Sequence, residues 1–262
     1  MADLQFLHMS DTHFLKVYQN VLEKWGVEYN PTEILEGFLK TIDFTKFDFV
    51  VHTGDLVHDG ELADYQSFKE LMETYIPEEI PVFYCLGNHD KKRLFHQVFN
   101  GEDTDKKWDY ISECKDYQLI FLDSSSEEMH DGVIDLSQAE WLKAQLEANR
   151  DKEIFIFQHH PLDISWINGL EKTQVPDNYE QLLNQYDIKG IFTGHLHQNR
   201  HYMVNNRIPQ HTANSLVFGM TIDDVWNNNR LGYSVVKVVN GNLDVYTDIV
   251  NPVVEQFNQN IL

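Results

Sequence analysis

Five short polar stretches of the chain combine carboxylate, imidazole and amide side chains. They are Asp11-Thr12-His13, Gly54-Asp55, Gly87-Asn88-His89-Asp90, His159-His160-Pro161 and Gly194-His195-Leu196-His197. Carboxylates and imidazoles bind Mn, Fe, Zn and related dications, and one aspartate can bridge two of them. Because no thiolate is present among these residues, a structural zinc site is disfavoured. The residue types therefore predict catalytic metal chemistry.

Each stretch follows an apolar run that is typical of a buried strand. The runs are Leu4–Met9, Phe47–His52, Val82–Leu86, Ile154–Phe157 and Ile188–Phe192. In open α/β sheets, ligands bind beyond the carboxyl ends of the strands, so we expect the five stretches to meet at one rim. Glycines before Asp55, Asn88 and His195 permit tight turns close to a metal. An extended strand end would also point alternate side chains, such as Asp11 and His13, the same way.

Taken together, the five stretches predict the hydrolysis of a phosphate ester. Two metals roughly 3.5–4 Å apart would activate water and bind a phosphoryl oxygen. A single Asp-x-His or His-x-His is weak evidence, because most such pairs are surface residues. Asp123 is interpreted as a turn residue at a strand end. Among the other histidines, we expect two in the core, His8 and His52, and three on the surface, His96, His130 and His201.

The rest of the chain predicts helices between the strands and a hairpin near the C-terminus. Four helices are expected: one capped by Asn30, one over Glu61–Tyr75, one after a Ser137/Glu140 capping box and one capped by Asp177. Tyr117–Asp123 is strand-like, and Asn240-Gly241 predicts a hairpin of Tyr233–Val239 with Leu243–Ile249. The segment 91–107 gives no clear pattern.

Composition limits the class of protein. The 262 residues are expected to form a single domain over 1–262, and the formal net charge of −22 argues against binding long nucleic acid. Cys85 and Cys114 are the two cysteines; one disulfide is conceivable, but buried thiols are more common. No signal peptide or membrane-spanning run is visible, so we expect a cytoplasmic protein without a membrane partner.

In their order and spacing, the five stretches resemble the calcineurin-like metallophosphoesterases, over roughly residues 4 to 200. Within that superfamily, Gly-Asn-His-Asp, Leu122-Asp123-Ser124, Gly132 and Trp141-Leu142 are most similar to the class III cyclic nucleotide phosphodiesterases. The resemblance implies a four-layer α/β/β/α sandwich with two mixed sheets flanked by helices. It also implies two metal ions (Mn, Fe or Zn) and is compatible with a homodimer.

The resemblance assigns a role to each site residue. One metal would be held by Asp11, His13 and His197, the other by Asn88, His159 and His195, with Asp55 bridging the two. His89 would face the phosphate and either stabilise its charge or protonate the leaving oxygen. The catalytic set is thus His89, Asn88 and Asp55.

At two points the assignment stays open. The family pattern Gly-Asp-x-x-Asp reads Gly54-Asp55-Leu56-Val57-His58 here, so the acid that would orient His89 is replaced, and Asp59 could take its place. Either histidine of the pair 159–160 could be the ligand; the motif position favours His159.

The function expected is hydrolysis of a small phosphate ester, such as a 3′,5′-cyclic nucleotide. A phosphomonoesterase or nucleotidase, a glycerophosphodiesterase and a non-catalytic scaffold are the alternatives. A DNA nuclease would share the chemistry but conflicts with the charge. We expect the substrate to be bounded by residues 14–29, Trp166 to Gly169, His211 and Asn214.

Overall fold

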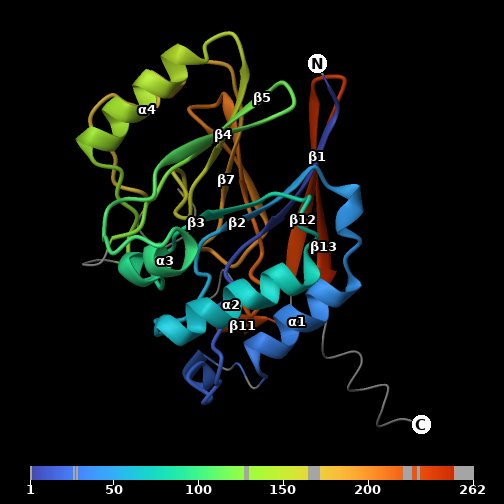
Figure 1. Cartoon of the computed structure of the whole chain (residues 1–262). Coiled ribbons are helices and arrows are strands. Elements are labelled where there is room, and N and C mark those ends of the chain that lie inside the picture. Colours follow the sequence, from blue (N-terminus) through green and yellow to red (C-terminus); the bar gives the residue numbers. More distant parts are fainter. Residues whose placement is uncertain are drawn as a thin grey trace.

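The structure is a computed structural model, which describes residues 2–25, 27, 29–126, 130–164, 172–220, 226–228 and 231–250. Two β-sheets form its centre, with helices on their outer sides (Figure 1). The first sheet has the order β13 (Asn242–Val250), β12 (Leu231–Val239), β1 (Leu4–Met9), β2 (Phe49–Thr53), β3 (Val82–Cys85). The second has the order β4 (Tyr110–Cys114), β5 (Tyr117–Phe121), β6 (Glu153–Phe157), β7 (Ile188–Thr193), β9 (Ile208–Thr212), β8 (Arg200–Val204).

The remaining elements are helices and one short ribbon. The α-helices are α1 (Pro31–Thr41), α2 (Leu62–Tyr75), α3 (Lys92–Phe99), α4 (Leu136–Ala148) and α5 (Tyr179–Leu183). Single 3₁₀ turns cover Glu23–Trp25 and Phe44–Lys46, and β10 (Gly219–Met220) pairs with β11 (Trp226–Asn228). No helix in the described ranges has the length and hydropathy that crossing a bilayer requires.

Both sheets are mixed. In the first, β1, β2 and β3 are parallel, while β12 and β13 run antiparallel to their neighbours. In the second, β5, β6, β7 and β9 are parallel, and β4 and β8 are antiparallel edge strands. The parallel strands at the centre of each sheet therefore deliver their carboxyl ends to one side.

In the described part of the chain, three apolar clusters separate the layers, because neighbouring residues of a strand face opposite sides. Phe6 of β1, Phe49 of β2 and Phe157 of β6 pack between the two sheets. Leu7 of β1 packs instead under α1 and α2, and Ile156 of β6 packs under α4 and α5. The order helix, sheet, sheet, helix confirms the predicted α/β/β/α sandwich.

Most predicted elements are confirmed, including the C-terminal hairpin and the Asn30 cap, whose side chain accepts from Thr32 N at 3.0 Å. The predicted caps of the last two helices are wrong. Asp135, with Gln138, forms the capping box of α4 instead of Ser137, and α5 follows Asn178 without a side-chain cap bond.

Local pattern also missed several elements. The described part of the chain has five α-helices instead of the four expected. The additional helix is α3, which lies in the segment 91–107 that gave no clear pattern. Strands β4, β8 and β9 were missed as well. His96 lies on α3 and is 3% exposed, so its expected surface position is wrong; its Nε2 lies 2.9 Å from the carbonyl of Lys106. Cys85 and Cys114 are both free thiols.

Candidate metal centre

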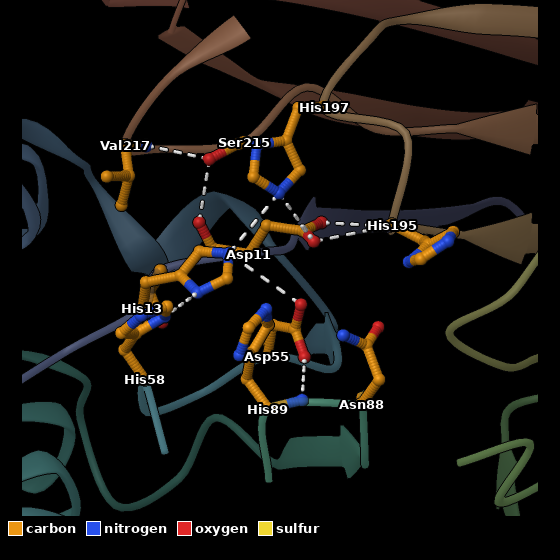
Figure 2. A network of polar contacts seen from close by, with 12 residues as sticks. Asp11, His13, Asp55, His58, Asn88, His89, His195, His197, Ser215 and Val217 are labelled. Carbon is orange, nitrogen blue, oxygen red and sulfur yellow. Dashed lines mark hydrogen bonds and ion pairs between the residues drawn. The ribbon is translucent and has the colours of Figure 1, made fainter. Parts of the chain in front are cut away.

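The five polar stretches meet where the carboxyl ends of the two sheets come together. Figure 2 shows residues of four of them, from Asp11 to His197. Asp11 and His13 follow β1, Asp55 follows β2, and Asn88 and His89 follow β3, all in the first sheet. His159 follows β6, while His195 and His197 follow β7, in the second sheet. The common rim is therefore shared by two sheets rather than built by one.

Five residues of this rim adopt the left-handed backbone region. The φ angles are 54° at Asp11, 42° at His13, 53° at Asp55, 68° at His195 and 49° at His197. This conformation strains residues other than glycine, and such strain concentrates at functional sites. The expectation that an extended strand end aligns alternate side chains is thus wrong. Asp11 and His13 are directed toward the site by tight turns with left-handed backbone conformation.

Backbone hydrogen bonds hold two of these turns together. Asp11 N donates to the carbonyl of Gly54 and His13 N to that of Asp55, both at 3.0 Å. The His195 N–H also lies 3.2 and 3.1 Å from the two carboxylate oxygens of Asp11. Loops from both sheets are therefore tied directly to Asp11.

Four buried side chains form the first part of the site. His197 Nε2 lies 3.1 Å from Asp11 Oδ1, and His13 Nε2 lies 3.6 Å from Asp55 Oδ2. The two imidazole Nε2 atoms are 3.3 Å apart. His197 Nδ1 donates to the carbonyl of Phe218 at 2.8 Å, which leaves its Nε2 lone pair toward the centre. These four residues could hold one metal ion among them.

Burial and charge set the protonation of these groups. Burial lowers the pKa of His13 well below its usual value, so its ring is neutral. Burial alone would raise the pKa of Asp11, but the neighbouring His197 outweighs it and the pKa is lowered. An ionised Asp11 and a neutral His13 are the states in which these side chains bind metal.

The second part of the site contains two buried polar atoms that make no hydrogen bond. His159 Nδ1 bonds to the carbonyl of Thr53 at 2.7 Å, while its Nε2 lies 3.4 Å from Asp55 Oδ2 and makes no hydrogen bond. Asn88 Oδ1 is likewise buried and unpartnered. Buried polar atoms are rarely left unpaired, so both atoms fit the role of metal ligands.

The ring of His195 lies beside those of His159 and His160 in the second part of the site. Its centroid lies 5.2 Å from that of His159 and 4.5 Å from that of His160. Burial lowers the pKa of His195 to about 3, which keeps it neutral. Burial would also lower the pKa of His159, but the charge of Asp55 dominates and raises it to about 9.

The geometry favours His159 over His160 as a ligand. Both ring nitrogens of His160 are occupied: Nδ1 lies 2.9 Å from Ser124 Oγ, and Nε2 lies 2.9 Å from the carbonyl of His130. Neither atom is therefore available to a metal, whereas His159 Nε2 is.

His89 is oriented by Asp59, not by the residue at the usual family position. Its Nδ1 lies 3.2 Å from Asp59 Oδ1, and its backbone N–H donates to Asp55 Oδ1 at 2.8 Å. Asp59 has a φ of 50°, and its N–H donates to the carbonyl of His89 at 3.1 Å. Burial would lower the pKa of His89, but Asp55 and Asp59 outweigh it and the pKa is raised.

His58 takes a different position from the acid that it replaces. Its ring lies against that of His89 in a tilted arrangement, with centroids 4.5 Å apart and an interplanar angle of 31°. Its Nδ1 lies 3.1 Å from His13 Nδ1. Burial lowers the pKa of His58 to about 4, so it is a neutral partner for His13.

Two positioning residues have no assigned role in the sequence patterns. Ser215 Oγ donates to the carbonyl of Asp11 at 2.8 Å and accepts from Val217 N, so it supports the strained turn at Asp11 (Figure 2). The Asp90 carboxylate accepts from the N–H groups of Leu56 and Gly87 at 3.1 and 2.9 Å. Asp90 lies within a recognised stretch, whereas no sequence signal pointed to Ser215.

The remaining expectations concern histidines, Asp123 and the substrate walls. His8 and His52 are buried and bonded to threonines, as expected, and His201 is exposed. Asp123 is buried and accepts from Ser125 N at 3.0 Å, which confirms a structural role. His211 stacks on Phe192 and Asn214 accepts from Asn199 N, so both pack within the fold. The expected wall Trp166 to Gly169 lies outside the described residues.

Comparisons with known proteins identify the family. A family profile described as calcineurin-like phosphoesterase matches residues 4–199. The chain belongs to this family. It is therefore a metallophosphoesterase, a hydrolase acting on phosphoric ester bonds, and the cluster described above is its candidate metal site.

Several curated relatives carry names of phosphodiesterases. A probable cyclic nucleotide phosphodiesterase of Rhodococcus erythropolis is 28% identical over 73% of this chain and 64% of its own length. The 3′,5′-cyclic adenosine monophosphate phosphodiesterase CpdA of Escherichia coli K12 is 28% identical over 75% and 70%. A probable glycerophosphodiester phosphodiesterase, GpdQ, of Arcobacter nitrofigilis is 26% identical over 73% and 71%.

Solved structures show the same fold. A dimetal phosphatase from Danio rerio superposes with a TM-score of 0.70 at 13% identity, covering 93% of this chain and 95% of that one. The purple acid phosphatase PPD1 of Lupinus luteus gives 0.65 at 14% identity, covering 95% and 52%. At these identities the likeness concerns the fold alone.

Proposed function

We propose that the chain hydrolyses a small phosphodiester, such as a 3′,5′-cyclic nucleotide, at a centre of two metal ions. The main support is the buried cluster in which Asp55 lies between two groups of imidazoles, with Asn88 Oδ1 and His159 Nε2 left without a hydrogen bond. A second metal would satisfy both atoms, which a single ion at the other group would not.

In this proposal Asp55 would be a ligand shared by the two ions. Asp11, His13 and His197 would complete the ligands of one ion, and Asn88, His159 and His195 would complete those of the other. Oxygen and nitrogen ligands of this kind suit Mn, Fe or Zn. His159 Nε2 must lose its proton before it can serve as a ligand, because Asp55 raises its pKa in the metal-free protein.

In the proposed reaction the metal ions and His89 have different roles. When bound, the two ions supply Lewis acidity that activates water and neutralises charge on the phosphoryl group. His89 faces this reaction with a raised pKa, which favours its protonated form. With Nδ1 held by Asp59, Nε2 is the atom that gives its proton to the leaving oxygen. The catalytic set remains His89, Asn88 and Asp55.

Charge and relatives support the substrate class. A net charge of −22 disfavours long nucleic acid, whereas a small ester can be drawn in by the local charge of the metals. The names of the relatives point to cyclic nucleotides first and glycerophosphodiesters second. We place the activity in the cytoplasm, where free thiols such as Cys85 and Cys114 persist.

A substrate panel under defined metal tests the proposal. Manganese-loaded protein should hydrolyse bis(p-nitrophenyl) phosphate and 3′,5′-cyclic AMP, and should be slower on p-nitrophenyl phosphate. Asp55→Ala should remove nearly all activity and bound metal. Asp103→Ala is the matched control, because Asp103 is a 59% exposed carboxylate paired with Arg93. Inactivity of metal-loaded wild type on all mono- and diesters would refute the enzyme and favour the scaffold.

A further inference from the structure

His130 lies beside the candidate metal centre although it belongs to none of the five polar stretches. Its exposed side chain comes from the segment between β5 and α4. Its ring Nδ1 lies 3.3 Å from Asn88 Nδ2, and its centroid lies 5.9 Å from that of His89. A histidine expected simply on the surface thus contacts a proposed ligand.

The contact determines which way the Asn88 amide faces. An amide has a donor end and an acceptor end, and a neutral imidazole has one nitrogen that accepts. When Asn88 Nδ2 donates to His130 Nδ1, Asn88 Oδ1 is turned away from His130. That oxygen is the buried, unpartnered atom of the site. We propose that His130 is a positioning residue that fixes the Asn88 amide with Oδ1 toward the metal centre.

The backbone of His130 is itself held in place by His160. His160 Nε2 donates to the carbonyl of His130 at 2.9 Å, while Nδ1 accepts from Ser124 Oγ at 2.9 Å. Gly132 lies directly on the same ring, since a Cβ there would fall 2.6 Å from His160 Cγ. The second histidine of the His-His-Pro stretch therefore anchors the residue that orients Asn88.

This inference rests on the dinuclear centre proposed above, and its test measures metal binding without substrate. Manganese binding to the full chain would be measured by equilibrium dialysis for wild type, His130→Ala and His130→Asn. Loss of a partner of this kind typically weakens metal binding 10–100-fold. We expect His130→Ala to weaken one of two sites by roughly that factor. His130→Asn should bind almost as wild type, because its Oδ1 is as many bonds from the backbone as His Nδ1.

His201→Ala is the control, since His201 is an exposed histidine that contacts His211 instead. Thermal unfolding by circular dichroism would verify that each variant is folded. Unchanged affinity in His130→Ala, or an equal loss in His130→Asn, would overturn the inference. So would a fall in kcat/KM with both ions bound normally, which would place His130 on the substrate. Fewer than two ions on wild type would instead refute the dinuclear proposal itself.

Discussion

Replacing Asp59 with asparagine tests whether this residue has taken over the orientation of His89. Asparagine keeps an acceptor oxygen for His89 Nδ1 but removes the negative charge 3.2 Å away. The ring should stay in place while its protonated form loses support. Since protonated His89 is the proposed acid, activity should be lost at lower pH in Asp59→Asn than in wild type.

Coulomb's law gives the size of the effect. Two unit charges 3.2 Å apart attract by roughly 1.3 kcal/mol in bulk water, and by more in a lower dielectric. The Asp59 side chain is 64% exposed, which places the pair near the aqueous limit. At 1.36 kcal/mol for each pH unit, the alkaline limb of the pH–rate profile should move down by about one unit or slightly less.

The assay is kcat against pH, from pH 6 to 10, on a phosphodiester with saturating manganese. Asp59→Ala, which also loses the acceptor, should lower kcat at every pH. Asp43→Asn is the control, because Asp43 is a 52% exposed carboxylate paired with Lys46. An alkaline limb that is identical in Asp59→Asn and wild type would show that another group sets the protonation of His89.

Three further predictions concern the metal centre. Manganese affinity of the metal-free protein should rise with pH up to about 9, by at most tenfold per unit, because binding displaces the His159 proton; dialysis showing a constant affinity from pH 7 to 8.5 would contradict this. Gly194→Ala should lower metal affinity and thermal stability, since its Cβ would lie 2.6 Å from Asp11 Oδ2, whereas Gly37→Ala, with open space, should not. Ser215→Ala should lower Tm, because the buried carbonyl of Asp11 loses its donor, at a cost of about 1–3 kcal/mol; an unchanged Tm would refute the support assigned to Ser215.

Those elements of the fold could be predicted whose signals lie within a few neighbouring residues, namely the hydrophobic period of a strand or helix and the residue types of a tight turn. The strands before the five polar stretches are rich in apolar residues, and Asn240-Gly241 is a strong turn signal, so β1 and the final hairpin were found. Strands β4 and β8 lie at the edges of their sheet and read as polar, so their pairing is set by neighbours far along the chain. The hydrophobic pattern alone did not show that the strands divide between two sheets, because that division depends on which faces pack together; the expectation of two sheets came from the family resemblance.

The proposed metal ligands could be predicted from the sequence, but the residues that hold these ligands in position could not. All the proposed ligands lie in the five stretches, because metal binding restricts the residue type at each position. Ser215 acts through its hydroxyl and His130 through its ring. Neither could be predicted, because a single serine or histidine outside a motif looks like any surface residue in the sequence. The replacement of the usual acid by His58 was visible, but only the positive φ of Asp59 shows how the turn brings the next carboxylate to His89.

The left-handed turns explain why so many supports are needed. A non-glycine residue in this region costs of order 1 kcal/mol, somewhat less for Asp and His, which occupy it more readily than other residues. Five such residues at one rim together cost roughly as much as the smaller net stabilities of folded domains. Glycine would relieve the strain but would remove the ligand. The turns must therefore be fixed from outside, by paired backbone bonds such as Asp11 N to Gly54, by the Ser215 hydroxyl and by His195 N–H on the Asp11 carboxylate. Loss of any one of these contacts should disturb the geometry of the metal centre before it unfolds the sheets.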